Sequence, residues 1–230
     1  MMADVGIVIF PGSNCDRDAY HVIANVLGRS VSYHWYNEPI GDQYKAVILP
    51  GGFAYGDYLR AGAMAKISPA VLSLGGFIEK GGVVLGICNG FQVLVEAGFL
   101  PGAMMKNQSL QFQCEDVYLK VESTKSRFLG QAKIGQVLRM PIAHSEGRYI
   151  VDQLTLAQLK KNDQIVLKYC SSHGEVEEKF NANGSTNSIA GVVNEKGNVM
   201  ALMPHPERAA EEILGNTDGL VIFKSLEAYL

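Results

Sequence analysis

Short apolar runs alternate with helix-spaced segments through the first half of the chain. Val5 to Phe10 is continuously apolar, as expected for a strand that is covered on both faces. Residues 16–27 repeat apolar side chains at helical spacing, and Gly28 follows where glycine commonly closes a helix. Residues 31–35 and residues 46–49 are predicted to form the next two strands. This rhythm favours an α/β fold with three layers, a flavodoxin-like and mostly parallel sheet with helices on both faces.

The same alternation predicts the remaining elements, with an added antiparallel β excursion in the middle. We expect helices at 67–80, 89–97, 154–161 and 219–230, and strands at 82–87, 117–121, 136–140, 165–170, 189–193 and 199–203. Residues 141–149 are predicted to form a polar loop, in which His144 and Glu146 lie close together. Residues 173–186 have no core pattern and are predicted to form a solvated insertion loop. We expect residues 1–230 to form a single domain.

Composition excludes several classes of partner. The chain has 230 residues, of which 47% are hydrophobic and 19% charged, and its formal net charge is −3. A chain of that length can bury a large hydrophobic core. Its slightly negative net charge does not indicate binding to nucleic acid or to an anionic membrane. No apolar stretch approaches the roughly 20 residues of a membrane span, and the start lacks the features of a signal peptide. We therefore expect a cytoplasmic protein.

The four cysteines are scattered along the chain without a Cys-x-x-Cys pair. Neither a disulfide framework nor a zinc site is indicated, and we predict no metal in this chain. Cys88 stands apart, because it lies in Gly86-Ile-Cys-Asn-Gly90, between an apolar run and a helix-like segment. Flanking glycines permit a sharp strand-to-helix turn, and a thiol at a helix N-terminus is favoured as the thiolate. The alternatives are an activated nucleophile and a small buried hydrophobe.

His205 is the candidate base for such a nucleophile. It lies between Pro204 and Pro206, which hold the segment extended, and Glu207 follows two residues later. Because residues i and i+2 of an extended chain point to the same side, the Glu207 carboxylate is expected beside the imidazole, where it orients the ring. The alternative is a rigid turn with a surface ion pair.

A glycine turn after the strand at 46–49, together with the candidate nucleophile Cys88 and the candidate base His205, would be suited to acyl transfer. Gly51, Gly52 and Phe53 follow that strand at its carboxyl end, where ligands bind in open parallel sheets. We predict that Gly52, Phe53 and the amide of Asn89 form an oxyanion hole, with Gly51 against the substrate. An ordinary turn is the alternative. Cys88 would then attack a carboxamide or ester carbon, and water would hydrolyse the resulting thioester.

The sequence resembles the triad, or class I, glutamine amidotransferase family. Gly86-Ile-Cys-Asn-Gly-Phe-Gln92 and His205-Pro-Glu-Arg208 carry the resemblance. Three further stretches, Phe10 to Asp16, Pro50 to Gly62 and Ala190 to Asn198, are similar to the glutaminase subunits of phosphoribosylformylglycinamidine synthases. Such subunits serve de novo purine synthesis, and the resemblance spans nearly the whole chain.

The resemblance implies a role for each matching residue and for partner proteins. It implies L-glutamine as substrate and the following residues: Cys88 as nucleophile, His205 and Glu207 as its partners, Gly52 and Asn89 at the oxyanion, and Gln92 beside the bound glutamine. It also implies a larger synthetase subunit, which uses ATP and Mg²⁺ and receives ammonia, and a small third subunit; no cofactor is implied in this chain. Ser145 stands where such relatives usually have glycine, and the stretch between Cys170 and Ser188 is longer than usual.

Two other functions are compatible with a cysteine at a sharp strand-to-helix turn. One is another α/β cysteine hydrolase, acting on esters or thioesters. The other is a flavodoxin-like redox sensor or chaperone, in which the cysteine is oxidised. The sensor hypothesis leaves the Pro-His-Pro-Glu segment at 204–207 without a purpose.

Overall fold

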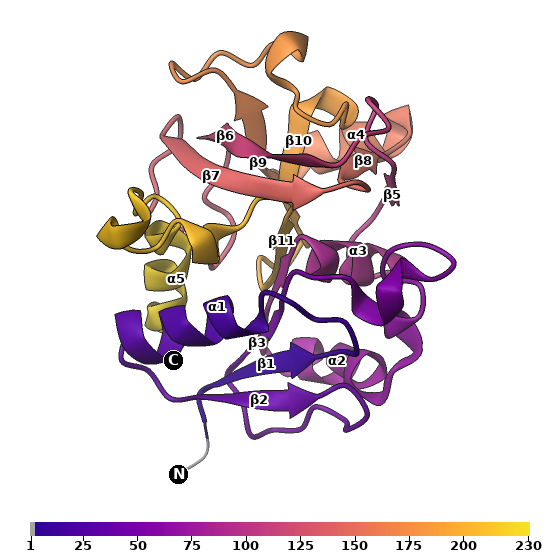
Figure 1. Ribbon diagram of the computed structural model, residues 1–230, viewed down its shortest axis with the longest axis vertical. Coiled ribbons are helices and arrows are strands. Elements are labelled where there is room, and N and C mark those ends of the chain that lie inside the picture. The colour runs from indigo at the N-terminus through magenta and orange to yellow at the C-terminus, as the bar shows by residue number, and fades with distance from the viewer. Residues whose placement is uncertain (1–2) are drawn as a thin grey trace.

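The computed structural model describes residues 3–230, which are arranged around a nine-stranded mixed sheet (Figure 1). Its strands are β1 (Val5–Ile9), β2 (Val31–Trp35), β3 (Ala46–Leu49), β4 (Val83–Ile87), β6 (Gln113–Val121), β7 (Val137–His144), β9 (Ile165–Cys170), β10 (Ile189–Val193) and β11 (Val199–Leu202). The order across the sheet is β2-β1-β3-β4-β11-β10-β9-β6-β7. A second sheet pairs β5 (Ala103–Met105) with β8 (Arg148–Ile150).

Helices cover both faces of the parallel half of the sheet, which confirms the three-layer α/β fold. They are α1 (Asp16–His21), which continues as a π-helical segment over Val22–Val26, α2 (Pro69–Glu79), α3 (Asn89–Glu96) and α5 (Leu220–Leu226). α4 (Gln153–Lys161) lies beside the antiparallel half of the sheet. In Figure 1, α1 and α5 lie on one side of the sheet and α2 and α3 on the other. Among residues 3–230, no helix has the length and apolar character needed to cross a bilayer.

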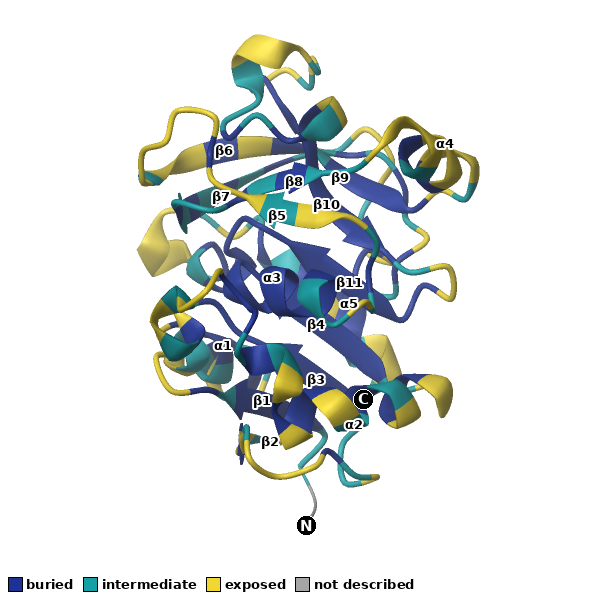
Figure 2. Cartoon of the chain, turned by 90° about the vertical axis from the view of Figure 1, so that its right-hand side faces the viewer, coloured by how far each residue is buried: buried dark blue, intermediate teal, exposed yellow. Residues whose placement is uncertain are grey.

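The hydrophobic core extends along both the parallel and the antiparallel half of the sheet. β2, β1, β3, β4 and β11 run parallel to their neighbours, and β10, β9, β6 and β7 extend the sheet with antiparallel pairings. Every residue of β3, β4, β10 and β11 is buried, and β3, β4 and β11 are dark blue in Figure 2. Strands buried on both faces explain the uninterrupted apolar runs of the sequence.

The predicted polar loop at 141–149 is wrong for most of its length. β7 continues through Pro141 to His144, and β8 begins at Arg148, so only a short turn separates the two strands. Alternate residues of β7 are buried, which is the period of a strand with one covered face. Because β7 lies at the edge of the sheet, Pro141 does not interrupt a ladder on both sides. The predicted β excursion is an extension of the main sheet.

The stretch at 173–186 is only partly the solvated loop that we predicted. Its charged first part is largely exposed and contains a 3₁₀ turn at Glu178–Phe180. Its end is different, since Asn183 and Ser185 are buried. Apolar periodicity gives no signal for such a segment, because polar side chains anchor it through hydrogen bonds to the interior.

Candidate active site

Cys88 occupies a strained turn between β4 and α3. Its φ of 50° and ψ of −104° place a non-glycine residue at positive φ, a conformation that costs on the order of 1–3 kcal/mol. A Cβ atom on Gly90 would collide with the carbonyl oxygen of Leu49, and one on Gly86 would lie 2.6 Å from Leu94 Cδ1. The two glycines therefore allow α3 to approach the sheet closely enough to hold Cys88 at the apex.

Strand pairing brings His205 to the same edge of the sheet. β4 and β11 are parallel neighbours, with Ile87 opposite Leu202. The amide of Cys88 donates to the carbonyl oxygen of Leu202 over 2.9 Å. Cys88 directly follows β4, and His205 follows shortly after β11. Because the carboxyl ends of parallel strands meet at one edge, the two residues leave the sheet side by side.

His205 and Glu207 contact each other in the protein interior. Nδ1 of His205 lies 2.6 Å from Oε1 of Glu207, and both side chains are almost completely buried. The backbone of His205 is extended, with φ −104° and ψ 91°, and its amide donates to the carbonyl oxygen of Pro141 over 2.8 Å. Among residues 3–230, Nε2 of His205 has no hydrogen-bond partner. That nitrogen is therefore available to a reacting group.

The surroundings of His205 favour its protonated form. Burial acts to lower the pKa of the imidazole, but the Glu207 carboxylate and the neighbouring Cys88 and Cys15 side chains outweigh burial and raise that pKa well above its ordinary value. Sγ of Cys88 lies 3.8 Å from the carbonyl oxygen of Ala143, to which the thiol donates. The structure thus brings Cys88, His205 and Glu207 together, as the sequence pattern predicted.

The glycine turn after β3 packs directly against the imidazole. A Cβ atom on Gly51 would lie 2.6 Å from Cε1 of His205, and Gly52 has φ +142°, which favours glycine. The amide of Phe53 donates to the carbonyl oxygen of Gly12 over 2.9 Å. This bond occupies the Phe53 amide and corrects the prediction that Phe53 is an oxyanion donor.

The other two predicted donors remain available. Within the described chain, the amides of Gly52 and Asn89 have no acceptor. The side chain of Asn89 donates to Oε1 of Gln92 over 2.8 Å, and Nε2 of Gln92 donates to the carbonyl oxygen of Glu146 over 2.8 Å. The Gln92 side chain therefore links α3 to the turn that joins β7 to β8, where the resemblance places the substrate.

Cys15 and Arg208 also lie at the site, although the sequence analysis singled out only Cys88 among the cysteines. Nη2 of Arg208 lies 3.2 Å from Sγ of Cys15, and Nε lies 3.1 Å from Oδ2 of Asp18. A Cβ atom on Gly51 would lie 3.1 Å from the same sulfur, on the side that also meets His205. The signal for Cys15 was the Pro-Gly-Ser-Asn-Cys segment after β1, which ends at the same sheet edge.

A buried polar network supports the β7–β8 turn, and apolar periodicity did not identify it. Nδ1 of His144 lies 3.0 Å from Oδ1 of Asn107, and that oxygen also accepts from the amide of Gly147 over 3.0 Å. Nδ2 of Asn183 donates to the carbonyl oxygen of Gly147 over 2.7 Å and to the hydroxyl of Tyr169 over 3.0 Å. Burial, with the nearby His205, lowers the pKa of His144 to about 4, so this ring is neutral.

One group near the site has the residue types of a metal centre. Cys15, His205 and Glu207 place potential ligand atoms within 4.8 Å of one another. Arg208 already contacts the thiol, and the imidazole already contacts the carboxylate. A cation would have to displace both contacts beside a fixed positive charge, so we assign no metal to this group.

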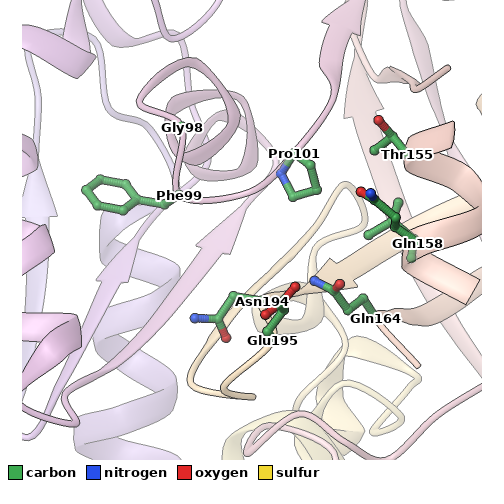
Figure 3. Close-up of a pocket in the computed structure, with 9 residues that line it drawn as sticks. Gly98, Phe99, Pro101, Thr155, Gln158, Gln164, Asn194 and Glu195 are labelled. Atoms are coloured by element: carbon green, nitrogen blue, oxygen red, sulfur yellow. The ribbon is translucent and has the colours of Figure 1, made fainter. Parts of the chain in front are cut away.

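A separate pocket of about 300 Å³ lies away from these residues (Figure 3). The chain after α3, with Phe99 and Pro101, forms one wall, and Gln158 of α4 forms another. Asn194 and Glu195 of the β10–β11 hairpin close it. No residue predicted for catalysis or substrate binding lines this pocket.

Comparisons with known proteins agree with the geometry. Residues 2–222 match the CobB/CobQ-like glutamine amidotransferase domain. Phosphoribosylformylglycinamidine synthase subunit PurQ of Moorella thermoacetica is 52% identical over 221 residues, 96% of this chain and 94% of the relative. The subunit of the same name from Salinibacter ruber is 50% identical over 226 residues, 98% of this chain and 96% of the relative. A chain in the structure of PurLQS from Thermotoga maritima has a TM-score of 0.85 and 42% identity, with 100% of this chain and 99% of that chain covered.

Proposed function

Because this chain belongs to the family of CobB/CobQ-like glutamine amidotransferase domains, we propose that it is the glutaminase subunit of a phosphoribosylformylglycinamidine synthase. Relatives about half identical over nearly their whole length carry that name. The observation that carries the chemistry is the placement of Cys88 and His205 beyond the paired residues Ile87 and Leu202, with Glu207 2.6 Å from Nδ1 of His205.

The reaction begins with attack of the Cys88 sulfur on the carboxamide carbon of L-glutamine. The thiol proton is held at Nε2 of His205, and Glu207 on Nδ1 orients the ring and stabilises the imidazolium. Negative charge then develops on the carboxamide oxygen. The amides of Gly52 and Asn89 donate to this oxyanion, and each such donor contributes about 3–4 kcal/mol to transition-state stabilisation in comparable sites.

Collapse of the tetrahedral intermediate breaks the carbon–nitrogen bond. The leaving nitrogen takes the proton held at Nε2 of His205 and departs as ammonia, so that a γ-glutamyl thioester remains on Cys88. Water then attacks the thioester with His205 as base, and the thiol leaves with a proton. The products are glutamate, ammonia and the free enzyme, and no proton or electron is left over.

Ammonia serves a second active site in this proposal. A larger synthetase subunit, assembled with this chain and a small third subunit, uses ATP and Mg²⁺ to convert formylglycinamide ribonucleotide to the amidine. A structure of PurLQS from Thermotoga maritima supports an assembly of this kind. The complex works in the cytoplasm, where purine synthesis takes place. Because free ammonia production would waste glutamine, the isolated chain is a poor glutaminase that docking activates.

Reconstitution with the synthetase subunits tests the proposal. The wild-type complex should make the amidine from either glutamine or added ammonium salts. Cys88→Ala should abolish the glutamine-dependent reaction and leave the ammonia-dependent reaction intact, whereas Cys170→Ala, a buried cysteine outside the site, should leave both intact. Comparable glutamine turnover by Cys88→Ala and wild type would contradict the assignment. Full glutaminase activity of the isolated wild-type chain would contradict activation by docking.

A further inference from the structure

A second cavity, of about 410 Å³, lies at the edge of the sheet opposite the catalytic residues. Lys45 of its lining directly precedes β3, and Gly82 and Val83 stand at the start of β4. Cys88 and His205 instead follow the carboxyl ends of β4 and β11. The length of a strand therefore separates this cavity from the reacting groups, and the proposed glutaminase chemistry does not use it.

Aromatic side chains form part of the cavity wall. Tyr44, Phe77 and Tyr229 line it, and they come from three separate segments of the chain. The ring of Tyr44 packs on Gly6 of β1, where an added Cβ atom would lie 2.7 Å from it, and the hydroxyl lies 3.0 Å from Oγ of Ser32 in β2. Two strands thus hold Tyr44 in place, so its ring offers the cavity a fixed surface for stacking.

The cavity is also lined by cations. Lys45, Lys80 and Arg127 contribute to its lining, and Asp42 is the single carboxylate there within the described chain. Lys45 is already paired with Asp4 over 2.9 Å. Lys80 lies 2.7 Å from Asp42, but both side chains are mostly exposed, so an anion can replace this weak surface pair. Lys80 and Arg127 are therefore the cations left for a ligand.

Arg127 is oriented and still has donors to spare. Its Nη1 donates to the carbonyl oxygen of Gly81 over 3.0 Å, and its guanidinium carbon lies 5.1 Å from the centre of the Tyr229 ring. No carboxylate of residues 3–230 pairs with it. A guanidinium has five N–H donors in a rigid fork, which matches the oxygens of a phosphate. The fixed side chain therefore meets an anionic group without first having to be ordered.

We propose that this cavity binds a nucleoside monophosphate, with its phosphate at Arg127 and Lys80 and its base against the aromatic wall at Tyr44. The volume lies within the range of small-molecule sites. Inorganic phosphate would use the cations and leave the aromatic wall uncovered, whereas an uncharged nucleoside would leave Arg127 without an anion. A nucleoside monophosphate satisfies both parts. This site is independent of the proposed glutaminase function.

Calorimetric titration of the full chain with adenosine monophosphate, adenosine and inorganic phosphate tests the proposal. We expect one molecule of adenosine monophosphate per chain, bound at least about tenfold more tightly than inorganic phosphate, because the base adds stacking. Arg127→Gln should weaken this binding by about tenfold or more, because hydrogen bonds to a charged group are lost. Arg127→Lys, which keeps the charge without the fork, should weaken it less. Lys125→Gln is the matched control, because Lys125 lies in the same loop but outside the cavity.

Three outcomes would overturn the proposal. The first is no binding of adenosine monophosphate at millimolar concentration, and the second is equal binding by Arg127→Gln and the wild type. The third is equal affinity for inorganic phosphate and for the nucleotide, which would show a site for anions without recognition of the base.

Two further measurements locate the ligand. Tyr44→Leu should reduce the preference for the nucleotide over inorganic phosphate, and Tyr44→Phe, which keeps the ring, should retain it. A chain that carries a glutamine-analogue label on Cys88 should bind the nucleotide as tightly as the unlabelled chain. Loss of binding after labelling would place the nucleotide in the catalytic site, and the proposal would be wrong. An unchanged preference in Tyr44→Leu would contradict stacking of the base on that ring.

Discussion

Ile87 of β4 lies opposite Leu202 of β11 in a parallel pairing. This register determines where the chemistry takes place, because the turn after Ile87 carries Cys88 and the extended segment after Leu202 carries His205. The amide of Cys88 also donates to the carbonyl oxygen of Leu202. Backbone pairing in the sheet therefore aligns two segments that are far apart in the sequence, independently of the side-chain contacts of the site.

Gly90→Ala should be severely destabilising, because the new methyl group would collide with the carbonyl oxygen of Leu49. We expect a loss of more than about 2 kcal/mol in the free energy of unfolding, measured by urea denaturation. Gly76→Ala in α2 is the matched control, since nothing lies within 4 Å of the new atom. It should stabilise the protein by about 0.5–1 kcal/mol. Equal effects at both positions would contradict the close approach of α3 to the sheet.

Asn183→Ala should weaken glutamine binding, because Asn183 holds the carbonyl oxygen of Gly147 in the β7–β8 turn. We expect the KM for glutamine to rise more than kcat falls, with a loss of about 1–3 kcal/mol in stability from the unsatisfied buried group. Lys179→Ala, at an exposed position of the same stretch, should change stability by less than about 0.5 kcal/mol. If the two variants behaved alike, the whole stretch would be the solvated loop that the sequence suggested.

His144 should make the fold sensitive to acid. Its pKa is about 4 in the folded protein against an ordinary value of 6.5. Between these values the unfolded chain binds a proton that the folded chain does not, so stability falls as the pH drops. Through this group the wild type should lose about 2 kcal/mol between about pH 7 and about pH 5.

The control for this prediction is His144→Gln, which has no titrating group at the position. Urea denaturation of both proteins at the two pH values gives the comparison, and the contributions of all other groups are common to the pair. The variant should lose about 2 kcal/mol less than the wild type. Identical losses would show that His144 is not held in its neutral form.

Glu207→Ala should reduce kcat less than the loss of Cys88 does. Without the carboxylate, the pKa of His205 falls and the ring loses its orientation, but the nucleophile and the oxyanion donors remain. In triads, loss of the orienting acid is roughly a hundredfold less damaging than loss of the nucleophile. Glutamate formation by the complex measures the effect, and Glu212→Ala, at an exposed position nearby, is the control. Full activity of Glu207→Ala would contradict a catalytic role for Glu207.

The parts of the protein that follow from local chemistry could be predicted from the sequence. The apolar run at 46–49 coincides with β3, because a strand buried on both faces needs uninterrupted apolar residues. The predicted strand at 31–35 coincides with β2, which is only partly buried. The glycines around Cys88 and the prolines around His205 restrict the backbone at those positions, so they indicate the turn and the extended segment.

The parts that depend on distant polar contacts could not be predicted. Asn107 and Asn183 reach the β7–β8 turn from loops without periodicity, and each is recognisable only by its partner. Pro141 suggested a loop, although an edge strand tolerates proline. The amide of Phe53 is occupied by Gly12, a contact between two turns that no local pattern reveals.

Covalent labelling with a glutamine-analogue electrophile, followed by mass spectrometric mapping, tests the central claim most directly. We expect the label on Cys88 and strongly slowed labelling in His205→Ala. Glutamine should protect Cys88 from the label, whereas analogues of glutamine that lack the side-chain amide should not. Label on the exposed Cys114 or on Cys15, with no protection by glutamine, would contradict the claim that Cys88 and His205 together cleave the side-chain amide of glutamine.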